Sequence, residues 1–269
     1  MGYSDRHEVY FRYATQKYNK ALRDQIAPLI DYIAEDNVML LDLTIDGLIK
    51  RDPISRAMRD VYVSILPREA VAIAKEVDRN LPKDKKINGI GFFSSYWKRW
   101  IQQAYLTLTS DMITNITETT KDKIRQLLSN GREQNLSYRQ LAKYMTDELK
   151  RDDFTRSRSL TIARTESTRA ANIGQQQMAQ TSNIVLNKKW EGRDDGRERI
   201  THVAASMQEP IPKDEPFIVG GFPMQYPGDR SAPASESVNC RCSMIFVPVL
   251  DADGLPVRRA NGLDRDLFG

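Results

Sequence analysis

The fold class is decided by residues 160–190, LTIARTESTRAANIGQQQMAQTSNIVLNKKW, because one kind of sequence pattern gives way to another inside this stretch. Up to about residue 182 the chain has the three- and four-residue apolar spacing that predicts helices with short breaks. Beyond that point it is rich in glycine, proline and short β-type runs. We therefore predict an α+β fold, with a largely α-helical N-terminal region that includes a long helix, followed by a small, loop-rich α+β C-terminal module.

The first part of the stretch belongs to a helix that we expect to run from a cap at Asp152 or Asp153 to about Thr181. Small residues at helical spacing allow another backbone to approach closely, so one face should be tightly packed. That face carries Leu160, Ala163, Ser167, Ala170, Gly174 and Met178. The other side carries Arg164, Glu166, Arg169, Asn172 and Gln176. Glu166 and Arg169 are three residues apart, which predicts a solvated pair worth only ~0.2–0.5 kcal/mol; a catalytic Glu166 is the alternative.

Further helices are predicted upstream from apolar spacing and capping residues, over about residues 7–34, from residue 52, over about 94–129 and over 137–149. Pro28 is expected to kink the first of them, and Pro67 to bend or split the second. Asn130-Gly131 should end the long helix, and Ser137 with Gln140 should form a capping box.

Downstream, the alternation of residue types predicts three strands, over residues 184–190, 217–219 and 239–250. The segment between the first and last strands is interrupted by prolines and by Gly220-Gly221, so it cannot be a regular sheet and should form a compact loop-rich module. The chain after Asp253-Gly254 is polar and is expected to be mobile or to serve in contacts.

The composition excludes several classes of protein. Of 269 residues, 40% are hydrophobic and 28% charged, which is typical of a folded globular protein, and the net charge of +4 permits a DNA contact without requiring one. No apolar run approaches the roughly 18 residues that span a bilayer, so we expect no membrane anchor, and the N-terminus has no signal-peptide layout. A Gly-rich phosphate loop is missing, which argues against an ATP-driven motor.

Cys240, Cys242, His202 and Asp195 form a candidate metal site. A thiolate pair and an imidazole are good zinc ligands, and two cysteines separated by one residue point to the same side of an extended strand. A disulfide between Cys240 and Cys242, which one residue separates, would be strained. Free thiols are therefore expected, as is usual in a reducing cytoplasm. The fourth ligand would be Asp195, Glu236 or water. In the alternative interpretation the cysteines are small buried hydrophobes and His202 bonds to a carbonyl or a carboxylate.

Two other groups of residues could carry a function. Arg197, Arg199 and Arg241 can pair with Asp194, Asp195, Glu198 and Glu236 in a polar network that holds the loops and presents a recognition surface. Separately, Trp97, Lys98, Arg99 and Trp100 interleave aromatic and basic residues in the manner of a nucleic-acid platform. The alternative is that these tryptophans are core or subunit-interface anchors.

Three blocks in a fixed order resemble the C-terminal domain of the Mu F-like head-morphogenesis proteins of phages. The first is Ile162-Ala163-Arg164-Thr165-Glu166 with Ala170, Asn172 and Gly174; the second is Trp190 with Asp195, Arg197, Arg199 and His202; the third is Tyr226-Pro227-Gly228-Asp229 leading, past Glu236, to Asn239-Cys240-Arg241-Cys242. Residues 204–207, Ala-Ala-Ser-Met, depart from the Asp-Gly that follows the histidine in this family. That departure puts a metal or turn function of the Asp-Gly in doubt.

We predict a helical N-terminal region over residues 1–130 and a polar C-terminal tail over 251–269 from the residue patterns, and the resemblance implies a Mu F-like head-morphogenesis domain over 131–250. It also implies a minor head protein of a tailed phage, without catalysis or cofactor, whose partners are the portal protein, other capsid or scaffold subunits and phage double-stranded DNA. Such a protein belongs in the virion, in the capsid interior or at the portal, and in the host cytoplasm during assembly. Two alternatives stay open: a metal-dependent hydrolase or transferase-like toxin module that uses His202, Asp195 and the cysteines, and a general nucleic-acid-binding protein.

Overall fold

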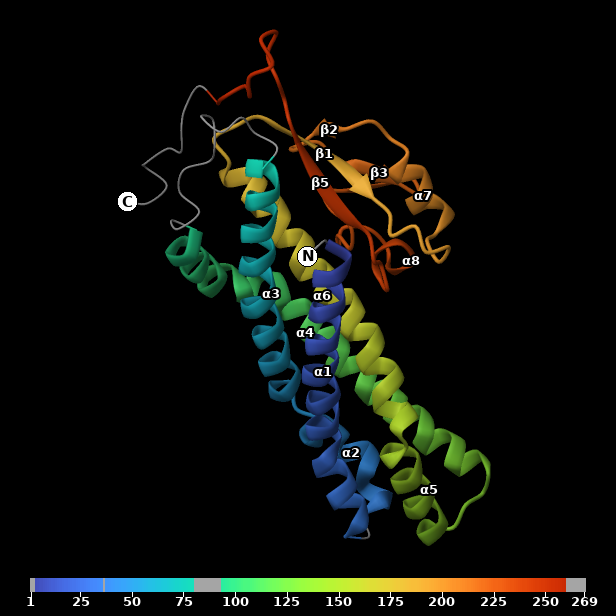
Figure 1. Ribbon diagram of the computed structural model, residues 1–269. Coiled ribbons are helices and arrows are strands. Elements are labelled where there is room, and N and C mark those ends of the chain that lie inside the picture. The colour runs from blue at the N-terminus through green and yellow to red at the C-terminus, as the bar shows by residue number, and fades with distance from the viewer. Residues whose placement is uncertain (1–2, 36, 80–92, 260–269) are drawn as a thin grey trace. The chain divides into compact units, whose positions relative to one another are not determined.

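The computed structural model describes residues 3–35, 37–79 and 93–259, and its elements confirm the α+β fold class (Figure 1). The helices are α1 (Tyr3–Ala34), the 3-10 helix η1 (Val38–Leu40), α2 (Leu41–Leu48), α3 (Asp52–Arg79), α4 (Phe93–Glu133), α5 (Tyr138–Lys150), α6 (Asp152–Thr181), α7 (Ile200–Ser206) and α8 (Ala234–Ser237). The strands are β1 (Leu186–Glu191), β2 (Ile211–Pro212), β3 (Phe217–Val219), β4 (Phe222–Met224) and β5 (Ser243–Pro248). None of the helices in the described ranges is long and apolar enough to traverse a lipid bilayer.

The chain forms two compact units. Unit 1 comprises Met1–Phe11, Tyr62–Ile101 and Arg164–Gly269, and unit 2 comprises Arg12–Val61 and Gln102–Ala163. Four helices, α1, α3, α4 and α6, contribute one part to each unit. The sequence-based division at residues 130 and 250 stays a prediction.

The predicted helices are confirmed, but Pro67 does not split its helix and Asn130-Gly131 does not end the long helix. Helix α3 is continuous through Pro67, because one proline removes a single backbone hydrogen bond from a helix that packing otherwise supports. Helix α4 continues through Asn130-Gly131 to Glu133, and the left-handed residue that follows it is Asn135, with φ 52°. Gly131 serves close packing instead, since a Cβ atom there would lie 2.3 Å from Leu141 Cδ1 of α5.

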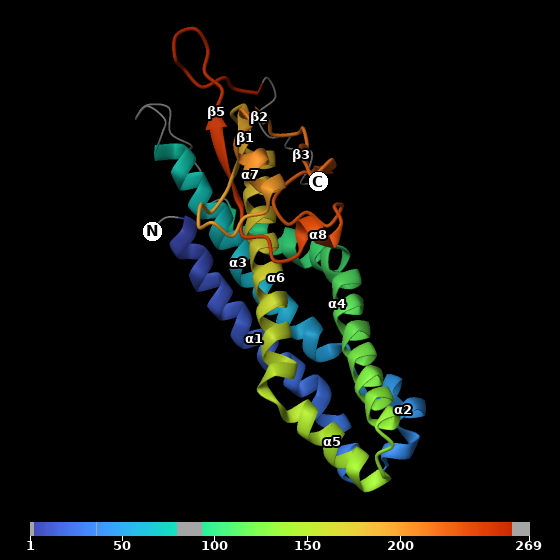
Figure 2. The same ribbon diagram turned by 90° about the vertical axis from the view of Figure 1, so that its right-hand side faces the viewer.

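Unit 2 has an apolar core that joins η1 and α2 to the second half of α1, the end of α4 and α5. Figures 1 and 2 show α2 and α5 together at one end of this unit. The fully buried members of the core are Ile26, Leu29, Ile33, Val38, Leu41, Ile45, Ile49, Ile124, Leu128, Leu141, Met145 and Leu149. The predicted capping box begins α5, where the side chain of Gln140 accepts a hydrogen bond of 2.9 Å from the Ser137 N–H.

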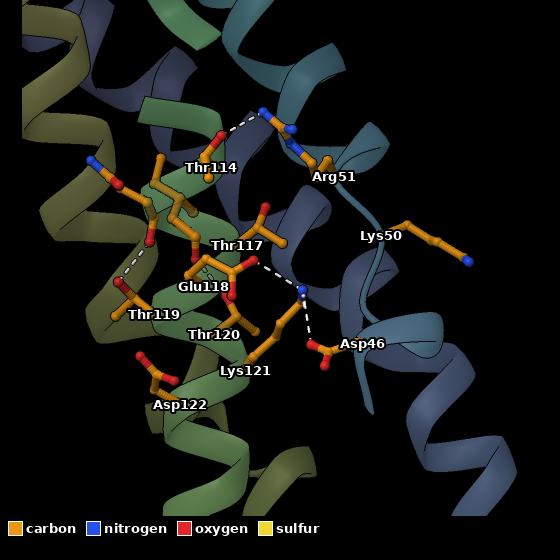
Figure 3. Close-up of polar contacts among 12 residues, drawn as sticks. Asp46, Lys50, Arg51, Thr114, Thr117, Glu118, Thr119, Thr120, Lys121 and Asp122 are labelled. Atoms are coloured by element: carbon orange, nitrogen blue, oxygen red, sulfur yellow. Dashed lines mark hydrogen bonds and ion pairs between the residues drawn. The ribbon is translucent and has the colours of Figure 1, made fainter. Parts of the chain in front are cut away.

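Polar side chains of α4 add ionic contacts to unit 2 (Figure 3). Lys121 Nζ lies 2.9 Å from Glu118 on the same helix and 3.0 Å from Asp46 of α2. Thr117 and Thr120 are buried and donate to backbone carbonyls one turn back in α4. These contacts let a polar helix face pack without unsatisfied hydroxyl groups.

The sheet of unit 1 has the strand order β2-β1-β5, with antiparallel pairs. Trp190 of β1 stands opposite Met244 of β5, and both side chains are buried. Burial alternates along β1, so Leu186, Lys188 and Trp190 share the inner face. Helix α7 packs against β1 and β3, close to the sheet (Figure 1). The strands predicted at residues 184–190 and 217–219 are confirmed as β1 and β3, whereas the strand predicted over 239–250 is confirmed only at Ser243–Pro248, so Cys240 and Cys242 precede it.

The proline-rich segment contains more regular structure than the sequence predicted. Strands β3 and β4 form a two-residue hairpin in which Gly220 and Gly221 have φ of 59° and 85°. A turn with two positive φ values is the type that matches the twist of a hairpin, and glycine adopts it without strain. Helices α7 and α8 and strand β4 were not predicted, because each is too short to show a period in the sequence.

The packed face expected on α6 is confirmed. Ser167, Ala170 and Met178 are buried. A Cβ atom at Gly174 would lie only 2.4 Å from the backbone oxygen of Leu66, so α3 and α6 come close together within unit 1. This contact fixes the part of α6 whose polar residues organise the C-terminal module.

Candidate functional site

The polar side chains of α6 join the sequence blocks that mark the C-terminal module. Arg169 Nε donates to the carbonyl of Gly228 at 2.8 Å, and Asn172 Nδ2 lies 3.1 Å from the carbonyl of Pro227. Asp229 closes this turn by accepting from the Gln225 N–H at 2.7 Å. Two α6 side chains therefore hydrogen-bond to backbone carbonyls of the Pro227-Gly228-Asp229 turn, and without them these buried carbonyls would have no partners.

The same helix holds the Asn239–Ser243 segment. Thr165 Oγ1 accepts from the Asn239 N–H at 3.0 Å, Asn172 Nδ2 lies 3.1 Å from the Cys242 carbonyl, and Gln175 Nε2 donates to Ser243 Oγ at 3.1 Å. Asn239 itself has a φ of 58°, in the left-handed region that asparagine tolerates better than most residues. Three bonds from one helix thus determine where Cys240 and Cys242 lie.

Glu166 and Arg169 are buried, and the expectation of a solvated pair was wrong. Arg169 lies 2.5 Å from Glu166 with each side chain about 6% exposed, and the Tyr62 hydroxyl donates to Glu166 at 2.9 Å. Burial, and next to it Glu166, raises the pKa of Tyr62. Burial opposes the charge of Arg169, but the neighbouring carboxylate raises its pKa. A buried pair with this many bonds costs several kcal/mol to break, so its effect on stability exceeds that of a surface pair.

Other buried polar groups of unit 1 were missed by the sequence analysis. Glu69 is fully buried, with Arg6 2.9 Å away and Gln175 donating to it at 2.9 Å. His7 lies 2.6 Å from Thr168 Oγ1, and Arg193 lies 3.3 Å from its Nδ1. Burial, with Arg193, lowers the pKa of His7 to about 4. A signal for Glu69 exists in the sequence: it lies four residues from Ile65 and from Ile73, on an apolar face of α3.

His202, Cys240 and Cys242 come together in a buried cluster. His202 lies on α7, and both cysteines lie in the short segment just before β5. His202 Nδ1 is 3.4 Å from Cys242 Sγ and 3.7 Å from Cys240 Sγ. The three donor atoms all lie within 4.8 Å of one another. The sequence analysis selected these residues together, and the structure brings them together.

Glu236 and Trp190 surround this cluster. Glu236 Oε2 lies 3.2 Å from His202 Nε2, an ion-pair distance without the alignment of a hydrogen bond, and accepts from Thr201 at 2.9 Å. The Trp190 ring meets the imidazole edge to face at 5.2 Å. A hydrogen bond from Cys240 lowers the pKa of Cys242, while that bond and burial raise the pKa of Cys240.

Asp195 lies outside this cluster. Its carboxylate pairs with Arg241 and lies 4.0 Å from Arg193, and its Oδ1 accepts from the Arg197 N–H at 3.1 Å. Arg199 donates to the Val238 carbonyl at 2.6 Å. Of the predicted polar network, the structure thus brings together Arg241 and Asp195, while Glu236 faces His202.

The remaining predicted residues fall in two places. Arg164 Nη1 lies 3.4 Å from Asn239 Oδ1, and the guanidinium carbon of Arg164 lies 5.0 Å from the centre of the Phe11 ring, in a cation–π arrangement. Trp97, Lys98 and Arg99 lie in α4, but their side chains are outside the described residues, and Trp100 is half-buried. A nucleic-acid contact there stays a prediction.

An exposed apolar surface lies on α7 and the hairpin, and we call it the α7 surface. It comprises Ile200, Val203 and Met207, at helical spacing, together with Ile218 and Phe222 of the β3–β4 hairpin. Ile200 is 89% exposed and Met207 76% exposed, although the opposite side of α7 buries His202. Gln208 donates to the Ile218 carbonyl at 3.3 Å and connects the two parts. Exposed apolar residues gathered in this way mark interaction sites more often than isolated ones do.

Residues 119–245 match a family model described as phage Mu protein F like protein. The match contains the part of α6 that binds the turn, the sheet, and the His202, Cys240 and Cys242 cluster. No curated protein and no solved structure matches the chain. The resemblance stated from the three sequence blocks is confirmed.

Proposed function

Since residues 119–245 of the chain belong to the family of phage Mu protein F like proteins, which are phage head proteins, we propose that the chain is a minor structural protein of a tailed-phage head. It acts by binding the portal protein and other capsid or scaffold subunits during head assembly, DNA packaging or genome delivery. It resides in the virion, in the capsid interior or at the portal, and in the host cytoplasm while heads assemble.

The α7 surface supports a function in binding. Ile200 and Met207 are among the most exposed apolar residues described, and they lie beside further exposed apolar residues on α7 and the hairpin, a grouping that marks interaction sites more often than a single exposed residue does. Their backbone is fixed by a rigid neighbourhood, because His202 on the other side of α7 is buried against Trp190. A preformed apolar surface loses little conformational entropy when it is covered by a partner.

Double substitution of this surface tests the proposal. Ile200→Asp with Met207→Asp should leave the melting temperature nearly unchanged, since both side chains are exposed, and should greatly reduce co-purification with the portal protein. Leu43→Asp, at an 83% exposed leucine in α2, is the matched control and should bind like the unaltered chain. Purified mature heads should contain the unaltered chain in few copies. Heads that lack the chain entirely would refute the proposal.

A second candidate, contact with phage double-stranded DNA, is favoured by arginines around Asp195. Burial, followed by the charges of Arg241, Arg197 and Arg193, lowers the pKa of Arg164. Cations so close together attract phosphate groups. Binding of the full chain to DNA should weaken with salt, and Arg197→Ala should reduce the slope of log K against log salt by about one. Arg151→Ala, at the C-cap of α5 and in an exposed pair with Glu148, is the control. Absence of DNA binding at low salt would exclude this candidate.

A further inference from the structure

We propose that His202, Cys240 and Cys242 bind one zinc ion, through the imidazole Nδ1 and the two thiolate sulfurs. Two sulfurs and one imidazole nitrogen are a donor set that suits zinc and excludes magnesium and calcium, which take oxygen ligands. All three residues are buried and come from two segments that the fold brings together. This inference does not rest on a function in the phage head.

The spacing of the donor atoms matches a tetrahedral zinc site. With Zn–S of about 2.3 Å and Zn–N of about 2.0–2.1 Å, the edge between sulfur and nitrogen of a regular tetrahedron is about 3.6 Å. The two observed Nδ1–Sγ distances are 3.4 and 3.7 Å, on either side of that value. Each sulfur therefore lies at the distance from Nδ1 that a shared zinc ion requires.

The position of Glu236 accounts for the orientation of the imidazole. Metal-binding histidines commonly present their other ring nitrogen to a carboxylate, which fixes the tautomer and increases the basicity of the ligand nitrogen. Glu236 Oε2 lies 3.2 Å from Nε2, so a proton at Nε2 leaves the Nδ1 lone pair facing the two sulfurs. Since this carboxylate oxygen faces the opposite ring nitrogen, we assign Glu236 as a positioning residue and not as a fourth ligand.

The single residue between the cysteines fits this arrangement. Cys240 and Cys242 lie just before β5, and the sulfur atoms of both face the same imidazole nitrogen, at 3.7 and 3.4 Å. Their backbone is anchored to α6 on either side, by the Asn239 N–H and the Cys242 carbonyl. Within the ranges that the structure describes, no fourth His, Cys, Asp or Glu joins the three donors. A fourth ligand from solvent would complete the tetrahedron.

Metal content of the full-length chain, purified under reducing conditions without chelator, tests the proposal. We expect one zinc per chain, removal by a chelator, and uptake of one equivalent of Zn²⁺ or Co²⁺ on return. Co²⁺ should give the visible absorption of a tetrahedral site together with thiolate-to-cobalt charge transfer. The melting temperature of the metal-free chain should rise with Zn²⁺ and not with Mg²⁺. A folded, fully reduced chain that takes up neither Zn²⁺ nor Co²⁺ would overturn the proposal.

Three variants separate the contributions of the residues. Cys242→Ser should lose the bound metal and the charge-transfer band. Glu236→Gln keeps all three ligands, and it should retain the cobalt spectrum while its affinity for Zn²⁺ falls about 10- to 100-fold. This variant keeps the test decisive if Cys242→Ser does not fold. Asp195→Asn is the control, because that carboxylate pairs with Arg241, and it should bind one equivalent unchanged. Loss of the metal in Asp195→Asn would show that the assigned ligand set is wrong.

Discussion

Substitution of three helical glycines by alanine should separate close helix packing from helix propensity. Alanine is favoured over glycine inside a helix by about 1 kcal/mol, so propensity alone predicts that each substitution stabilises the protein. At Gly174 the added Cβ would lie 2.4 Å from the backbone oxygen of Leu66 and 3.2 Å from its carbonyl carbon. A backbone cannot rotate away as a side chain can. Restoring a separation of 3.0 Å therefore requires α3 to move by at least ~0.6 Å.

The cost of that movement should exceed the gain in propensity. Overpacking of a tight site costs about 1–3 kcal/mol, and more where the backbone must move, so Gly174→Ala should lower the free energy of unfolding by about 1–2 kcal/mol net. Gly47→Ala in α2 meets no atom within 4 Å and should raise it by up to ~1 kcal/mol. In Gly131→Ala the added Cβ meets the end of the Leu141 side chain at 2.3 Å, and this flexible end can move aside. The change in the free energy of unfolding should therefore lie between those of Gly174→Ala and Gly47→Ala.

Urea denaturation followed by circular dichroism measures the free energy of unfolding of each variant. Hydrogen exchange assigns each change to unit 1 or unit 2. Gly174→Ala should lower the protection of amides in unit 1, where α3 and α6 meet. The argument is refuted if Gly174→Ala stabilises the protein as much as Gly47→Ala does. Such a result would mean that the distance between α3 and α6 is larger than the structure gives.

Two further results are expected from buried charges. Glu166→Gln should lower the free energy of unfolding by about 3–5 kcal/mol, because it leaves Arg169 buried and uncompensated. Glu148→Gln, in an exposed pair with Arg151, should change the free energy of unfolding by less than ~0.5 kcal/mol. Equal effects of the two substitutions in a denaturation experiment would contradict the burial of the pair between Glu166 and Arg169. The lowered pKa of His7, about 4, means that the unfolded chain takes up a proton near pH 6.5 while the folded chain does not, so up to about 3 kcal/mol of stability should be lost as pH falls from 6.5 to 4. His7→Gln should have a shallower fall in melting temperature over this window, and an unchanged slope would disprove the assignment.

Much of the fold could be predicted because its signals are local. The caps at Ser137 and Asp152 predicted where α5 and α6 begin, and alternation predicted β1 and β5. Pro67 and Asn130-Gly131 misled the prediction, because packing against other helices overrides the local tendency of these residues to interrupt a helix. The two units could not be predicted from local pattern, since four helices divide between them.

The candidate site was predicted in its residues but not in all of their partners. His202 and the cysteines were selected because their chemistry is uncommon, and the structure brings them together. Asp195 and Glu236 were equal candidates for the fourth metal ligand in the sequence. Only their positions in the structure show that Asp195 pairs with Arg241 and that Glu236 contacts the imidazole of His202. The burial of Glu166 depends on Tyr62, a residue 104 positions away, which helical spacing cannot reveal.

Beside an apolar core that includes Trp190, Phe217 and Met244, the C-terminal module buries several charged groups and leaves several apolar side chains exposed. Lys188, Glu166 and Arg169 are buried, whereas Ile200 and Met207 face solvent. Burial lowers the pKa of Lys188 to about 8, and its ammonium donates to the Gln225 carbonyl at 2.8 Å. Satisfied ionic and hydrogen-bonding groups can hold a small module in one conformation, although they contribute less net free energy than apolar burial. The apolar side chains on α7 lie outside the module's own core, so a partner that covered them would gain hydrophobic free energy that folding of the module has not used.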